Sequence, residues 1–225
     1  MFKISLKTSF LIISIIFIVI FSLLHMNLYE SKKENLYDAG ENLVGAHTIA
    51  KFNTFSLNWD PHPSAKREPI YPFFLGMIIK AKSIFIQDAD DIVLQDIEEV
   101  NTLKIFNMII LFLTIYLVGA FVIIHTKNLF LSAYAIASLV FSASLAESAH
   151  TFLSEVISSF FILTTSILLY LYGRYSNKIW YYFLLGLIVS SLVLTKAFYL
   201  YFIPIIIFYM IFIKFDEIRL NKKKY

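Results

Sequence analysis

Six long apolar runs limit what this chain can fold into. A transmembrane helix needs about 20 mainly apolar residues, and each run, with its flanks, approaches that length. The runs are continuous rather than alternating, which argues against the strands of a membrane β-barrel. Of the 225 residues, 59% are hydrophobic and 16% are charged, which is typical of a membrane protein. We therefore predict an all-α integral membrane protein with about six transmembrane helices, at residues 9–24, 103–124, 129–145, 156–172, 179–194 and 198–213.

A long polar segment, residues 25–102, separates the first apolar run from the other five. Within it, residues 71–86 are apolar enough to form a span, but they contain Lys80 and Lys82. Such lysines can extend to the lipid headgroups, so we predict a helix that lies in the membrane interface or re-enters it. We predict a single membrane domain, residues 1–225, whose long first outer loop contains juxtamembrane and interfacial helices.

The distribution of basic residues predicts the orientation. Short loops rich in Lys and Arg favour the cytoplasmic side, and long loops are largely exempt from this rule. We therefore expect both termini in the cytoplasm, an uncleaved first span, and residues 25–102 outside, in a bacterial inner or plasma membrane. With six spans, the basic segments all fall on one side: residues 1–8, 126–128, 173–178 and 214–225.

An acidic patch follows the first span. The spacing of Glu34, Asp38 and Glu41 places them on one face of a helix. In a catalytic interpretation, one of these carboxylates is a general base at the membrane surface. In the alternative interpretation, the helix is simply solvated, with Lys32 and Lys33 as partners of the acids. The pattern leaves the choice among the three acids open.

A second polar motif is the string Arg67-Glu68-Pro69-Ile70-Tyr71-Pro72. Pro69 disfavours the α conformation for Glu68, and Pro72 fits the first turn of a helix. We expect extended backbone at Arg67 and Glu68, just before a helix at the membrane surface. The planar guanidinium of Arg67 suits a phosphate. The alternative is an ordinary interfacial anchor with a proline at the helix start.

Further polar residues lie at the outer junctions of the predicted spans. Ser154 followed by Glu155 is typical of a helix start. Glu147, His150 and Glu155 also offer oxygen and imidazole ligands for a divalent cation. No fixed motif supports a metal site there, so we assign no metal ligand. Lys196 is either a loop lysine that extends to the interface or a phosphate ligand.

Several classes of function lack their signatures in this sequence. The chain has no cysteine, which excludes disulfides, thiol catalysis and thiolate metal sites. It has no Walker loop, dinucleotide-binding glycine fingerprint, zincin helix or nucleophile elbow. The lysine-rich tail is more simply explained as a cytoplasmic anchor than as a nucleic-acid patch, so we predict no nucleic-acid partner.

Taken in order, these motifs resemble the membrane-embedded glycosyltransferases with the C-type fold. The nearest group is the protein-mannosyltransferases and aminoarabinose transferases, glycosyltransferase family 39. That family has an early acid in a long outer loop, an Arg-x-Pro-x-Tyr-Pro-type string, a Ser/Thr–acid pair that opens a span and a Leu-Thr-Lys string that ends one. The chain departs from the family in lacking an Asp-Glu pair followed by tyrosine, and it is shorter, like a truncated or minimal version. The matching positions are Asp38 (or Glu34 or Glu41), residues 67–72, Ser154-Glu155 and Leu194-Thr195-Lys196.

The resemblance implies transfer of a sugar from a polyprenyl-phosphate donor to an acceptor glycan, lipid or protein at the outer membrane face, with inversion at the anomeric carbon. It implies no certain cofactor and leaves a divalent cation open. The alternative function is a non-catalytic membrane assembly subunit, or a degenerate or truncated relative. A transporter ranks third, because Ser and Thr are nearly all the polar residues that the predicted spans offer. The implied catalytic residues are Asp38 and Glu68, and the implied substrate or phosphate ligands are Arg67, Tyr71, Glu155 and Lys196.

Overall fold

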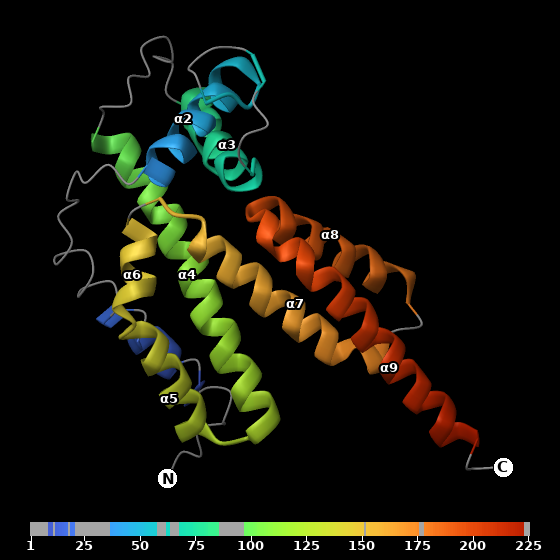
Figure 1. The fold of residues 1–225 in the computed structure, drawn as a ribbon. Helices are drawn as coiled ribbons and strands as arrows, with labels where there is room; N and C mark the ends of the chain where they lie inside the picture. Colours follow the sequence, from blue (N-terminus) through green and yellow to red (C-terminus); the bar gives the residue numbers. More distant parts are fainter. Residues whose placement is uncertain are drawn as a thin grey trace. The chain divides into compact units, whose positions relative to one another are not determined.

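All secondary structure in the described part of the chain is helical, as predicted (Figure 1). The helices form two compact units, residues 1–160 and residues 161–225, each with a core of its own. Whether the chain folds as one domain stays a prediction. The computed structural model describes residues 9–10, 12–17, 19–20, 37–57, 62–63, 68–85, 97–150, 152–175 and 178–222.

Three helical segments are long and apolar enough to cross a membrane: Thr102–Thr126, Glu155–Tyr172 and Ala197–Lys214. Two apolar helices are shorter, Leu129–Val140 and Ile179–Thr195. The predicted first span, residues 9–24, lies partly outside the described residues; those described are helical. The chain is therefore an all-helical protein with three candidate membrane-spanning helices among the residues described.

Four of the predicted apolar runs form helices close to their expected bounds. Each helix extends a little beyond its run, because polar residues continue the helical hydrogen bonds past the apolar part. The last run begins with a short 3-10 helix, η2, at Ala197–Tyr201. The corresponding α-helices are α4 (Ile97–Thr126), α7 (Glu155–Tyr175), α8 (Ile179–Thr195) and α9 (Phe202–Lys222).

The predicted helix at residues 129–145 is wrong in extent. Helix α5 (Leu129–Val140) ends after 12 residues, and α6 (Ala143–His150) begins after a turn. In this turn the N–H of Ser142 donates to the carbonyl of Leu139, three residues back, which closes a tighter turn than the α-helix allows. Apolarity does not mark such a break. At about 18 Å, α5 alone is shorter than a hydrocarbon core of about 30 Å.

Helices α2 (Tyr37–Phe52) and α3 (Ile70–Phe85) lie side by side near one end of α4 (Figure 1). A methyl group on Gly76 would lie 2.7 Å from the carbonyl oxygen of Ala46, so glycine allows this close approach. A helix, α3, lies at the predicted position 71–86, with Pro72 in its first turn. Its position relative to a membrane stays a prediction.

Each unit is held by a small apolar core. In the first unit, α4 and α5 cross at Gly119, where a side chain would meet Ile136 at 2.6 Å. The hydroxyl of Ser132 donates to the Gly119 carbonyl at 2.9 Å. Small residues at such crossings are typical of helices that pack in membranes. In the second unit, the core consists of Leu168, Tyr172, Tyr181 and Leu185.

Candidate functional site

A buried polar network joins three separated segments of the first unit. The Tyr71 hydroxyl, at the start of α3, donates to Oδ1 of Asn107 at 3.0 Å and accepts from its Nδ2 at 2.8 Å. The same Nδ2 lies 3.1 Å from the carbonyl of Ala149, near the end of α6. Tyr71 and Asn107 are each only 1% exposed. The start of α3, the middle of α4 and the end of α6 are thus fixed to one another.

A second asparagine holds the connection that follows α6. Nδ2 of Asn42, in α2, donates to the carbonyl of Phe152 at 3.0 Å. Phe152 has a φ of 55°, a left-handed conformation that is unfavourable for a bulky residue. The surrounding contacts must stabilise it, and the bond from Asn42 is one of them. Amides from α2 and α4 therefore position the α6–α7 connection from two sides.

This connection leads into the first turn of α7, where Glu155 lies. The predicted helix start is confirmed: Glu155 is the first residue of α7, and the N–H of Ser158 donates to the Ser154 carbonyl at 2.9 Å. A carboxylate there faces the positive end of the helix dipole.

Burial raises the pKa of Tyr71 far above its usual value; the hydrogen bond from Asn107 opposes this shift, and the charge of Glu155 adds to it. Tyr71 therefore stays a neutral phenol, within electrostatic reach of Glu155.

The other predicted site residues of the first unit are described to different extents. Glu68 is half-buried and lies two residues before α3, in the connection that also contains Pro69. Asp38 lies in the first turn of α2, and its side chain lies outside the description. Arg67 and Glu34 lie outside the described residues. Glu41 is half-buried in α2, and its Oε2 is buried. The choice of base among the three acids therefore stays open.

Lys196 belongs to the second unit, where it links α8 to η2. Its backbone N–H donates to the carbonyl of Leu192 at 3.2 Å, and its own carbonyl accepts from the N–H of Tyr199 at 3.0 Å. The predicted junction between two apolar segments is therefore confirmed. Its role as a phosphate ligand stays a prediction.

The sequence analysis missed the asparagines that organise the first unit. Asn107 lies within a predicted apolar span, where we had weighed only Ser and Thr as polar residues. An amide in such a helix is costly unless it is hydrogen-bonded, so its presence there was the available signal. Asn42 and the buried His47 lie in α2 among residues of mixed polarity, where the sequence pattern carries no comparable signal.

The proposed cation ligands do not gather into a recognisable metal centre. Among the described residues, no three His, Cys, Asp or Glu side chains are grouped as metal ligands. Glu147 is exposed on α6, whereas His150 and Glu155 are half-buried. A role for a divalent cation stays untested.

No protein-family model, curated protein or solved structure matches this chain. The resemblance to the C-type glycosyltransferases therefore rests on the sequence motifs alone and stays a prediction.

Proposed function

We propose that this chain is a membrane glycosyltransferase, or the amino-terminal core of one, that moves a sugar from a polyprenyl-phosphate donor to an acceptor glycan, lipid or protein at the outer membrane face. The proposal includes six spans, with α2 and α3 as the juxtamembrane and interfacial helices of the first outer loop. It also includes both termini in the cytoplasm of a bacterial inner or plasma membrane.

One observation supports this function best: the Tyr71–Asn107–Ala149 network links the start of α3, which follows Glu68, to α6, which precedes Glu155 in the chain. Glu68 precedes Tyr71 by three residues, and the charge of Glu155 acts on Tyr71. A transferase needs carboxylates from distant parts of the chain near one substrate.

The chemistry of the proposed reaction is a single displacement. The acceptor hydroxyl or amine forms a bond to the anomeric carbon, and the bond from that carbon to the phosphate oxygen breaks. The carboxylate of Asp38 takes the acceptor proton, and the polyprenyl phosphate leaves with the bonding electron pair. Attack from the opposite face inverts the configuration.

The remaining residues are assigned by their charges. Arg67 stabilises the negative charge that develops on the leaving phosphate. Lys196 belongs to the second unit, and its role as a phosphate ligand rests on the sequence motif alone. Glu68 and Glu155 orient the acceptor. Tyr71 was predicted as a substrate ligand, but its hydroxyl is buried and bonded to Asn107, so we assign it a positioning role instead.

The experiment is transfer of radiolabel in membranes that contain the full chain. The donors are hexosyl and pentosyl polyprenyl phosphates, tested one by one, and the variants are Asp38→Asn and Glu68→Gln. We expect one donor to give a labelled product with the wild type. Both variants should lower that rate at least about tenfold. Asp38→Asn removes a general base, which contributes about 10²–10⁴-fold, and Glu68→Gln misplaces the acceptor, which can cost about 10²-fold.

The matched control is Glu147→Gln, which neutralises an exposed carboxylate in the same unit. We expect it to transfer at the wild-type rate. Transfer that is equal in all four proteins would refute the assignment of the two acids. No transfer from any donor, with protein of normal abundance, would refute the function.

A non-catalytic assembly subunit is the second candidate. The observation in its favour is that the Tyr71 hydroxyl and the Asn107 amide are engaged with each other inside the protein. Under this function, Asp38→Ala and Glu68→Ala would leave cellular glycans unchanged, while a variant that breaks the network, such as Asn107→Leu, would still lower the abundance of the protein.

A further inference from the structure

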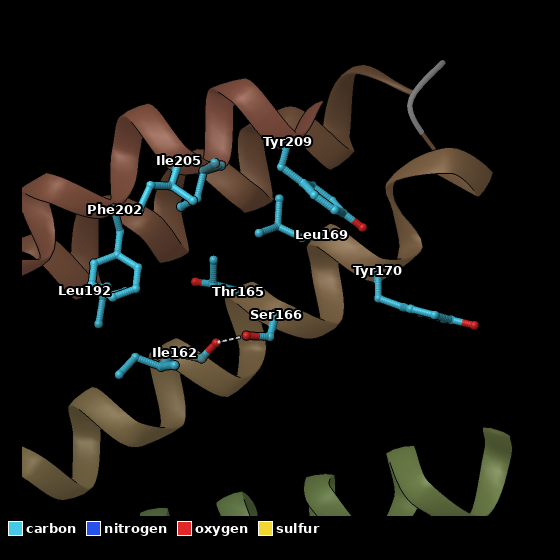
Figure 2. A pocket seen from close by; sticks show the side chains of 10 residues that line it. Ile162, Thr165, Ser166, Leu169, Tyr170, Leu192, Phe202, Ile205 and Tyr209 are labelled. Atoms are coloured by element: carbon cyan, nitrogen blue, oxygen red, sulfur yellow. Dashed lines mark hydrogen bonds between the residues drawn. The ribbon is translucent and has the colours of Figure 1, made fainter. Parts of the chain in front are cut away.

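The second unit contains a pocket of about 310 Å³ between α7, α8 and α9 (Figure 2). Its wall is mainly apolar, with Ile162 and Leu169 from α7, Leu192 from α8, and Phe202 and Ile206 from α9. Pockets for small molecules are commonly about 300–1,000 Å³ and mostly apolar, with a few placed polar groups. This pocket has those properties, and the glycosyltransferase assignment makes no use of it.

Four residues of the pocket wall carry hydroxyls, and Thr165 is the buried one; Ser166, Tyr170 and Tyr209 are exposed. Oγ1 of Thr165 is buried and has no hydrogen-bond partner among the described residues, and the residue is 5% exposed. Figure 2 shows the side chain pointing from α7 into the space toward α8 and α9. The neighbouring hydroxyl of Ser166 is already used, because it donates to the Ile162 carbonyl at 2.9 Å. Thr165 therefore provides one uncommitted hydroxyl in an apolar wall.

Two other buried threonines of the apolar helices bond to their own backbone. Thr195 donates to Ser191 at 2.7 Å, and Thr114 donates to Ile110 at 2.8 Å, each four residues back. Thr165 makes no such bond. A buried hydroxyl without a partner is unfavourable, and native proteins leave few of them. Such an exception, located in the wall of a pocket, indicates a group that a ligand would satisfy.

We propose that this pocket binds a bilayer-soluble apolar molecule with a ring carbonyl, and that the Thr165 hydroxyl donates to this carbonyl. A carbonyl needs only the one buried donor, whereas a ligand hydroxyl or amine would also need an acceptor, and the other hydroxyls of the lining, Ser166, Tyr170 and Tyr209, are exposed. The inference goes beyond the proposed glycosyl transfer and does not depend on it.

Size and depth define the ligand further. A dry apolar cavity of about 150 Å³ accommodates benzene, so about twice that volume suits a fused two-ring system. Thr165 lies about 15 Å along α7 from Glu155, roughly half of a hydrocarbon core of about 30 Å. A molecule that reaches it must therefore dissolve in the bilayer.

The test uses two probes that differ in their carbonyl groups. The full chain in detergent micelles is titrated with 2-methyl-1,4-naphthoquinone and with 2-methylnaphthalene, and binding is followed by saturation-transfer NMR, with empty micelles as the reference for partitioning. The chain has no cysteine that could form a thiol adduct with the quinone. We expect the quinone to bind about fivefold more tightly than the hydrocarbon, the size of one neutral hydrogen bond.

Three variants test the contact itself. Thr165→Val removes the hydroxyl at nearly constant volume and should make the two affinities equal, whereas Thr165→Ser should keep the preference for the quinone. Ser166→Ala is the matched control and should bind both probes as the wild type does. Equal affinities in the wild type, no binding of either probe, or an unchanged preference in Thr165→Val would each overturn the proposal. Loss of the preference in Thr165→Ser would overturn it as well.

Discussion

At the scale of single residues, Asn107 joins three helices of the first unit. It is an amide in the candidate span Thr102–Thr126, yet it is 1% exposed and bonded to a side chain from α3 and a carbonyl of α6. Polar residues in apolar helices are expensive when unsatisfied and stabilising when they join segments. Asn107 therefore contributes specificity that apolar packing alone does not provide.

Replacing Asn107 with leucine should destabilise the protein by about 1–3 kcal/mol, because the Tyr71 hydroxyl and the Ala149 carbonyl lose their partner inside the protein. The free energy of unfolding is measured by denaturant titration in mixed micelles. The double variant Asn107→Leu/Tyr71→Phe should lose less free energy of unfolding than the two single variants lose together, because both substitutions remove the same bond.

Thr114→Val is the control for this substitution. Thr114 lies in the same helix and is also buried, but its hydroxyl bonds only to the Ile110 carbonyl of its own helix. We expect a loss well below that of Asn107→Leu. Equal losses for the two variants would show that Asn107 contributes helix packing and not a link between helices.

His47 gives the first unit a dependence on pH. It is 5% exposed in α2; burial lowers its pKa below the usual value of about 6.5, and the charge of Lys51 lowers it further. Below about pH 6.5 the unfolded chain therefore binds more protons than the folded protein. The contribution of His47 to stability is fully present above that pH and is lost as the pH falls toward the pKa of His47 in the folded protein.

We expect the wild type to lose stability between pH 7.5 and pH 5 by more than the variant His47→Gln, which is neutral throughout. The measurement is the free energy of unfolding at several pH values. The matched control is His62→Gln, which replaces an exposed histidine. If His47→Gln shows the same pH dependence as the wild type, other groups cause it.

At the scale of helices, the pair α2 and α3 is fixed by close backbone approach. A methyl group on Gly76 would lie 2.7 Å from the Ala46 carbonyl oxygen and 3.0 Å from Cβ of Ile49. Neither atom is the mobile end of a side chain, so the helices would have to separate. Glycine here serves packing, although it weakens helices by about 0.5–1 kcal/mol relative to alanine.

Gly76→Ala should therefore destabilise the protein by about 1–3 kcal/mol, the usual cost of overpacking. Gly40→Ala is the matched control in α2: a methyl group there meets no atom of the described residues within 4 Å, so the gain in helix propensity should stabilise the protein by about 0.5–1 kcal/mol. We expect the melting temperature to fall in Gly76→Ala and to rise in Gly40→Ala, relative to the wild type. Stabilisation by both substitutions would contradict the close approach of α2 and α3.

At the scale of the whole molecule, the proposed orientation is open to a direct test. The chain has no cysteine, so single cysteines can be introduced without background. Lys127, Lys178 and Pro63 are all exposed. In right-side-out spheroplasts, a membrane-impermeant maleimide should label Pro63→Cys but neither Lys127→Cys nor Lys178→Cys until the membrane is permeabilised. Labelling of Lys178→Cys in intact spheroplasts would reverse the proposed sidedness.

The sequence by itself determined the helical class and most helix positions. Runs such as 156–172 and 179–194 became α7 and α8, because burial of apolar residues and the hydrogen bonds of a helix are both local requirements. The helix starts near Pro72 and Ser154 were predictable for the same reason. The break after Val140 was not, because apolarity continues through it.

Only the tertiary structure decided which segments meet. The bond of Tyr71 to Asn107 joins residues 36 apart, and that of Asn107 to Ala149 joins residues 42 apart. No local pattern encodes such pairs, because they depend on how whole helices cross. The position of the Thr165 hydroxyl also depended on the tertiary structure. Its sequence neighbours resemble those of other span hydroxyls, and only the packing of α7, α8 and α9 places it in the wall of a pocket.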